Sequence, residues 1–171
     1  MEVSTIAQVG APVLQAVAEP VLQFDESLHS LVKRMQMIMQ EANGVGIAAP
    51  QIFASLRVII IASRPSERYP DAPLMESIVL INPELIAYSE EMVLGWEGCL
   101  SVPDLRGEVN RHQWVIAKYQ DISGQQHQQK LQGFVARIFQ HELDHLNGHI
   151  FLDRINDEQA LMSTSEWLQQ S

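Results

Sequence analysis

The sequence predicts an α+β fold formed by one domain that spans residues 1–171. Two segments with the apolar spacing of helices lie one toward each end of the chain, and several short β-branched runs lie between them. Because helices and strands do not alternate along the chain, a parallel βαβ arrangement is not indicated. A chain of this length can also bury the core of one domain without disulfides.

The first helix is expected to begin after Asp25, because an aspartate can accept hydrogen bonds from the free N–H groups of a first helical turn. Apolar residues then recur at helical spacing, at Leu28, Leu31, Val32, Met35 and Ile38. The helix is expected to end before the sequence NGVG at residues 43–46, since asparagine and glycine tolerate left-handed backbone.

The middle of the chain is expected to supply the strands. β-Branched and aromatic runs, followed by one more polar run, predict strands at residues 57–62, 77–82, 108–111, 113–119 and 125–130. The sequence DISG at residues 121–124 is typical of a turn between the last two strands. Residues 63–73 contain three prolines and are expected to form an exposed loop.

A second long helix is expected over residues 131–146, with Gly148 as its natural stop. Because successive helical residues are rotated by about 100°, five residues share one arc, which we expect to face solvent: Gly133, Arg137, Gln140, Asp144 and Asn147. His141 and His145 lie at the margin of the remaining, apolar arc. Glu142 lies within that arc, where a lone carboxylate needs a partner or a chemical task.

The sequence QHELDH at residues 140–145 predicts a metal site on this helix. Two histidines one turn apart can direct their imidazoles to one metal ion, with the glutamate beside its open coordination position. However, histidines at this spacing also occur as one buried and one surface residue, and such short motifs match by chance. The third ligand therefore decides whether the site exists and to which class it belongs.

Cys99 is the residue whose chemistry best completes this site. No histidine lies six residues beyond His145, as one class of HExxH peptidases requires; His149 comes too early, and the later glutamates, Glu158 and Glu166, lie in a short polar tail. A thiolate and two imidazoles supply three tetrahedral positions and leave the fourth for water. The alternative for Cys99 is a small buried apolar residue.

A glycine-rich stretch, GVGIAAPQ at residues 44–51, is a further candidate for substrate binding. Its small residues can admit a substrate backbone, and Gln51 offers a neutral amide donor to a reacting oxygen. The alternative is a helix stop followed by a tight loop, with Gln51 at the surface. The stretch lacks the lysine of a phosphate-binding loop and the spacing of a dinucleotide motif.

The composition argues against several classes of partner. The formal net charge is −10, so we do not expect direct binding of nucleic acid, which requires clustered lysine and arginine. The longest apolar runs, VIIIA and IVLI, are too short to cross a membrane, and the first residues lack a signal-peptide pattern. A single cysteine fits a reducing compartment, so we expect a cytoplasmic location.

Three motifs in this order, GVGIAAPQ, EGCLS and QHELDHLNG, resemble those of the peptide deformylase family. The resemblance extends from about Val13 to about Arg154. It implies antiparallel strands packed around the central helix that carries the HExxH motif. It also implies hydrolysis of the N-formyl group of N-formylmethionyl peptides, with release of formate, early in bacterial or organellar translation.

The resemblance further implies the metal and its ligands. The ion in the cell is expected to be Fe²⁺, one per chain, held by Cys99, His141 and His145, with Ni²⁺, Co²⁺ or Zn²⁺ able to substitute. Geometry alone favours Zn²⁺, because two imidazoles and a thiolate suit a tetrahedral d¹⁰ ion. The resemblance and the donor set therefore point to different metals.

The remaining site residues surround this centre. Glu142 is expected to take the proton of the attacking water and return it to the departing amine. The Gln51 amide and the Leu100 N–H are expected to stabilise the oxyanion. By resemblance, Gly46 and Arg106 help to hold the peptide backbone.

Two features depart from the shorter members of that family, and two other functions stay open. Residues 63–77 form a longer loop, and the chain after Arg154 contains no lysine or arginine, so ribosome docking through a basic C-terminal helix is in doubt. Glu97 and Arg111 could support the metal ligands or be simple surface charges, and they are not assigned. Another HExxH metallopeptidase would be indifferent to loss of Cys99, and a metal-stabilised binding domain would tolerate loss of Glu142.

Overall fold

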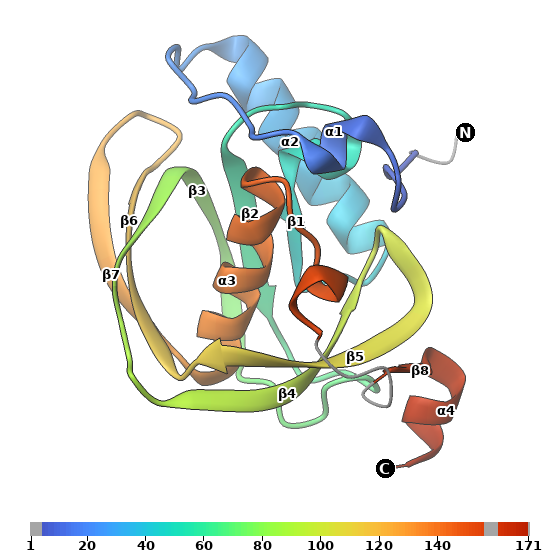
Figure 1. The fold of residues 1–171 in the computed structure, drawn as a ribbon. Helices are drawn as coiled ribbons and strands as arrows, with labels where there is room; N and C mark the ends of the chain where they lie inside the picture. The colour runs from blue at the N-terminus through green and yellow to red at the C-terminus, as the bar shows by residue number, and fades with distance from the viewer. Residues whose placement is uncertain (1–4, 156–160, 171) are drawn as a thin grey trace.

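The computed structural model describes residues 5–155 and 161–170, and its architecture is α+β, as predicted (Figure 1). A five-stranded sheet has the order β1-β2-β3-β6-β7, and a three-stranded sheet has the order β4-β5-β8. All pairs of neighbouring strands in these sheets are antiparallel. The strands are β1 Gly46–Ala48, β2 Val58–Ser63, β3 Met75–Tyr88, β4 Met92–Cys99, β5 Val102–His112, β6 Trp114–Gln120, β7 Gln126–Gln132 and β8 Leu161–Ser163.

Four α-helices and two short 3-10 helices complete the described part of the chain. They are α1 Pro12–Gln15, α2 Glu26–Glu41, η1 Ala49–Ile52, α3 Gly133–Leu146, η2 Phe151–Arg154 and α4 Thr164–Gln169. Figure 1 shows α2 and α3 on opposite sides of strands β1 and β2. None of the described helices combines the length and the apolarity that a membrane crossing would require.

Strand β2 explains why the five-stranded sheet has a helix on each face. Its side chains alternate: Val58 and Ile60 pack with residues of α2, whereas Ile59 and Ile61 pack with residues of α3. All four are fully buried. A strand covered on both faces has no polar side to show, which is why the run VIIIA is continuously apolar.

Helix α2 confirms the first predicted helix and its start. The Asp25 side chain accepts a hydrogen bond from the backbone N–H of Leu28 at 3.2 Å. The helix ends at Glu41, and Asn43 follows with a left-handed φ of 55°. The predicted capping residue and the predicted stop therefore both have their expected backbone roles.

The predicted start of the second helix is wrong by two residues. Leu131 still belongs to β7, where it pairs with Val115 of β6. Helix α3 begins at Gly133, whose φ of 59° turns the chain from strand to helix without a Cβ clash. The predicted strands near residues 57, 77, 108, 113 and 125 are all present, although β3 and β5 are considerably longer than expected.

The expectation that one arc of this helix faces solvent is also wrong for three of its five residues. Arg137, Gln140 and Asp144 are buried, while Gly133 and Asn147 are exposed. The three-stranded sheet covers this arc and supplies polar partners. Gln140, for example, accepts a hydrogen bond from the His112 backbone N–H at 2.9 Å and donates one to the His112 carbonyl at 3.0 Å.

Candidate active site

Cys99, His141 and His145 come together although the cysteine and the first histidine are 42 positions apart in the sequence. Cys99 is the last residue of β4, directly before the two-residue turn to β5, and both histidines lie on α3. Their ligand atoms all lie within 4.8 Å of one another, and Cys99 Sγ lies 3.3 Å from His145 Nε2. The docking of this hairpin on α3 therefore assembles the predicted ligand set.

The chemistry of these three side chains fits a metal ion. His141 Nδ1 is engaged by Glu97 at 2.8 Å, which leaves Nε2 for a metal. Burial raises the pKa of the Cys99 thiol, but the His145 and His141 imidazoles outweigh it and hold that pKa well below its usual value. A thiolate is the form that binds metals. The three donors leave a fourth tetrahedral position for water or substrate.

Of the later ligands considered for other classes, those in the described part of the chain do not join this cluster. Gly148 has a φ of 83°, which turns the chain after the helix. The side chain of His149 is 57% exposed, and its Nδ1 lies 3.8 Å from Asp153 Oδ2. Glu166 is exposed on α4, and Glu158 lies outside the described residues. Within residues 5–155 and 161–170, the Cys99 cluster is the one group of this kind that could hold a metal.

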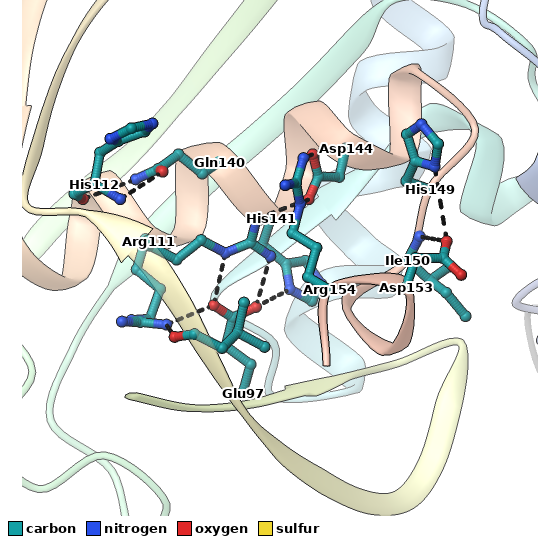
Figure 2. A network of polar contacts seen from close by, with 12 residues as sticks. Glu97, Arg111, His112, Gln140, His141, Asp144, His149, Ile150, Asp153 and Arg154 are labelled. Atoms are coloured by element: carbon teal, nitrogen blue, oxygen red, sulfur yellow. Dashed lines mark hydrogen bonds and ion pairs between the residues drawn. The ribbon is translucent and has the colours of Figure 1, made fainter. Parts of the chain in front are cut away.

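A buried ionic network supports the first histidine (Figure 2). Glu97 accepts two hydrogen bonds from Arg111 at 2.9 Å, one from Arg137 at 2.7 Å, and binds His141 Nδ1 at 2.8 Å. Burial raises the pKa of Glu97, but Arg111 and His141 reverse this effect and hold it well below its usual range. The carboxylate is therefore charged and fixes the orientation of the His141 ring.

The network continues along the same side of α3 to Asp144. Asp144 accepts hydrogen bonds from Arg111 and Arg154, each at 2.7 Å. Figure 2 shows Arg111 between the two carboxylates of Glu97 and Asp144. Because Glu97 and Arg111 are 4% and 3% exposed, they are part of the buried support of the site, one of the two roles that the sequence left open for them.

Glu142 lies in the same cavity as the cluster but has few polar contacts. It is 4% exposed, and its Oε1 has no hydrogen-bond partner among the described residues. Burial raises the pKa of Glu142 to about 7, against the lowering effect of the two histidines. A carboxyl group with a pKa near neutrality can both accept and donate a proton, which suits a general base.

Gln51 is buried and held in one orientation, which excludes the surface alternative. Its Oε1 accepts a hydrogen bond from the Ala48 N–H at 2.9 Å. Its Nε2 donates to Ser101 Oγ at 3.1 Å and lies 3.6 Å from Cys99 Sγ. The amide N–H is thereby directed toward Cys99 Sγ. It lies beside the position at which a substrate bound at the metal would react.

These residues line one cavity of about 270 Å³. Its wall also includes Gly46, Leu100, which follows Cys99 in the hairpin turn, and the buried side chain of Arg106 from β5. All eight residues expected from the sequence to form the site therefore lie at or directly beside the same cavity, on α3, β1, η1 and the β4–β5 hairpin.

Three glycines make room for charged side chains around this cavity. A Cβ at Gly46 would lie 2.5 Å from Glu142 Oε2, and one at Gly95 would lie 2.9 Å from the Arg137 guanidinium. A Cβ at Gly98 would overlap the guanidinium of Arg106. None of these glycines has a positive φ, so what each supplies is space.

An antiparallel α+β fold in which an HExxH helix meets a cysteine-bearing hairpin defines a class of metal-dependent hydrolases. The family model described as polypeptide deformylase matches residues 3–160, and the chain belongs to this family. Members of the family remove the N-formyl group from nascent peptides. This membership does not favour the alternative of another HExxH peptidase.

Individual relatives agree with this assignment. The chain is 49% identical to peptide deformylase 2 of Shewanella oneidensis, over 92% of this chain and 88% of the relative, and 46% identical to peptide deformylase 2 of a Nostoc strain, over 97% and 93%. Its structure resembles that of an Acinetobacter baumannii class I type b peptide deformylase bound to Met-Ala-Ser, with a TM-score of 0.86 and 51% identity over 88% of this chain and 96% of the other. It also resembles Plasmodium falciparum peptide deformylase, with a TM-score of 0.81 and 37% identity over 89% and 86%.

Proposed function

We propose that this chain hydrolyses the formyl amide of N-formylmethionyl peptides at the Cys99, His141 and His145 centre. One observation carries the proposal: the buried Glu142 carboxyl group, with a free oxygen and a pKa of about 7, lies beside the three ligands in one cavity. The solved Acinetobacter relative holds Met-Ala-Ser, which is the deformylated form of such a substrate.

In this proposal the side chains around the centre handle protons and developing charge. A divalent ion held by Cys99, His141 and His145 supplies Lewis acidity and lowers the pKa of a bound water. Glu142 takes a proton from the attacking water at its free oxygen. As the C–N bond breaks, Glu142 returns that proton to the departing amine, and the formyl carbon, now carrying the oxygen of the attacking water, leaves as formate. Because the same carboxyl group serves both steps, a pKa near neutrality suits it.

The oxyanion that forms on the formyl oxygen is stabilised by two donors. The Gln51 amide is already oriented by Ala48 and Ser101, so it needs no reorganisation as charge develops. The Leu100 backbone N–H, in the turn after Cys99, is the second donor. Gly46 and Arg106 hold the peptide backbone in the same cavity.

For the metal, we infer one Fe²⁺ per chain in the cell, with Ni²⁺, Co²⁺ or Zn²⁺ able to substitute. The support is the family, since two imidazoles and a thiolate by themselves suit Zn²⁺. A ferrous ion beside a thiolate is sensitive to oxygen and peroxide. Activity of the Fe²⁺ protein is therefore expected to decay in air, while the Ni²⁺ protein remains active.

The proposed setting is the cytoplasm, with nascent formylmethionyl peptides as substrate. A single cysteine and the family support this setting. Ribosome docking through a basic C-terminal helix is not part of the proposal, because residues 155–171 contain no lysine or arginine.

Formate release from formyl-Met-Ala-Ser, with acetyl-Met-Ala-Ser as a control substrate, tests the function. The acetyl peptide is expected to react far more slowly, because its extra methyl group must fit a wall of small residues. Glu142→Gln should keep its metal and lose about 10²–10⁴-fold in kcat. Cys99→Ala should lose metal and activity together, and Glu166→Gln should change neither. Retention of metal in Cys99→Ala would reject the ligand assignment, and equal rates on the two peptides would reject the substrate.

A further inference from the structure

Two segments that are distant in sequence meet at the same wall of the active-site cavity. The loop between β2 and β3 contributes Arg68 and Tyr69, and the C-terminal segment contributes Thr164. This segment is attached because β8 pairs with β5, with Met162 opposite Arg106. The wall beyond the metal centre is therefore built by parts of the chain outside the three motifs.

Arg106 lies against a pair of aromatic rings from these segments, whose centres are 5.9 Å apart. Its guanidinium carbon lies 4.7 Å from the ring centre of Trp167 and 5.7 Å from that of Tyr69. Its Nη1 also donates a hydrogen bond to the Tyr69 hydroxyl at 2.7 Å. On another side the guanidinium lies directly against Gly98. The cation is thus confined by the loop, the C-terminal segment and the strand that carries Cys99.

Among the described residues, the partners of Arg106 do not compensate its charge. The side chain is 5% exposed, yet it forms no ion pair within the described part of the chain, and its Nε is buried without a hydrogen-bond partner there. A carboxylate partner would occupy these donors, whereas the aromatic faces stabilise the cation and leave its N–H groups available. The arrangement therefore fixes Arg106 through Nη1 and, among the described residues, leaves its remaining donors without an acceptor, so that they can bind a neutral group such as a peptide carbonyl.

We propose that Tyr69 and Trp167 are positioning residues that act through Arg106 to bind the part of the substrate that follows the formylmethionine. The proposal rests on the proposed deformylase function and extends it to this loop and to the C-terminal segment. Tyr69 is itself fixed by its contact with Phe134 of α3, at 4.8 Å between ring centres. Tyr69, and through it Arg106, is thus held against the helix that carries both histidine ligands.

This role predicts an effect on binding rather than on chemistry. A carbonyl that follows the methionine is held equally in the ground state and in the transition state, because no charge develops there. Loosening Arg106 should therefore raise KM and leave kcat unchanged. Loss of one cation–π contact at a mostly buried site should raise KM by roughly threefold to thirtyfold.

The test compares Trp167→Leu with Trp167→Phe, and Gln169→Ala, an exposed position of the same helix, is the matched control. Leucine and phenylalanine both fill apolar space, but only phenylalanine offers an aromatic face. With formyl-Met-Ala-Ser, Trp167→Leu should raise KM roughly tenfold, and the phenylalanine variant should recover most of the loss. With formyl-Met, which lacks the following residues, KM should change little. Tyr69→Phe, which keeps the ring and removes the hydroxyl bond, should raise KM for the tripeptide about threefold.

Several results would overturn the proposal. These are an unchanged tripeptide KM in Trp167→Leu, an equal rise in the leucine and phenylalanine variants, and a fall in the kcat of Trp167→Leu that the control does not share. A wild-type protein that releases no formate would instead reject the proposed function, so the two failures are distinguishable. Thermal unfolding of each variant shows whether the fold is intact.

Discussion

Glu97→Gln tests whether the buried network supports the metal site, because it removes one charge while keeping the shape of the side chain. The carboxylate accepts four hydrogen bonds, three from the guanidinium groups of Arg111 and Arg137 and one from His141. A glutamine has one acceptor oxygen, so either orientation of its amide sets an NH₂ group against two of these donors. The variant also leaves Arg137 without its carboxylate partner and Arg111 with Asp144 alone.

The magnitude follows from this count. A hydrogen bond to a charged group contributes about 1.5–3 kcal/mol, so two lost bonds cost about 3–6 kcal/mol. Removing one partner of a buried ion pair costs about 3–5 kcal/mol, in agreement. For a chain of this length 1 kcal/mol corresponds to about 2–4 °C in Tm. The apo protein should therefore melt on the order of 10 °C lower than wild type.

The same variant should weaken metal binding, because His141 loses the acceptor that orients its ring. Such supporting residues typically change metal affinity by about 10–100-fold. Thermal unfolding of the metal-free proteins and competition with a chromophoric chelator measure the two effects separately. Glu90→Gln, an exposed position just before β4, is the control. A Glu97→Gln protein with the Tm and metal affinity of this control would refute the reasoning.

Three further predictions address the cavity, the helix and the metal. In Gly46→Ala the added Cβ would lie 2.5 Å from the Glu142 carboxyl group and 2.9 Å from the Ile138 side chain, so both should be displaced. The value of kcat/KM should fall at least about tenfold. Wild-type kinetics would contradict this prediction. Gln140→Ala leaves the His112 N–H and carbonyl without their partner, and urea unfolding should show a loss of about 2–3 kcal/mol that an exposed Gln128→Ala change does not cause. Chelation of the metal should lower Tm, because a ligand at 100 times its Kd adds about 2.7 kcal/mol, and an unchanged Tm would argue against a bound metal.

Local sequence signals predicted the parts of the fold that depend on local physics. The Asp25 cap, the periodicity of α2 and the continuous apolar run of β2 each report a contact or a burial within a few residues. Strand β4 gave no such signal. Its sequence contains Gly95 and Gly98, which lower strand propensity, and both are needed to admit arginine side chains from elsewhere in the chain.

The surroundings of the site were less predictable than its ligands. The helical rotation correctly grouped Arg137, Gln140 and Asp144, but hydropathy records only that these residues are polar. Whether a polar arc faces solvent or a second sheet depends on where its partners lie, and Glu97 is 40 residues away from Arg137. That distance is bridged by the register of the β4–β5 hairpin and its docking on α3, which no short sequence window contains.

The glycines opposite charged side chains have a consequence for how this protein tolerates change. The Arg137 guanidinium fills the space that a side chain at position 95 would need. The size of side chain that each position accepts is therefore set by the residue at the other. A larger residue at 95 should be tolerated only when a shorter one stands at 137, and a scan of single substitutions would score both positions as intolerant. Libraries that vary the two positions together should therefore recover folded proteins, with a reshaped cavity wall, that no single substitution reaches.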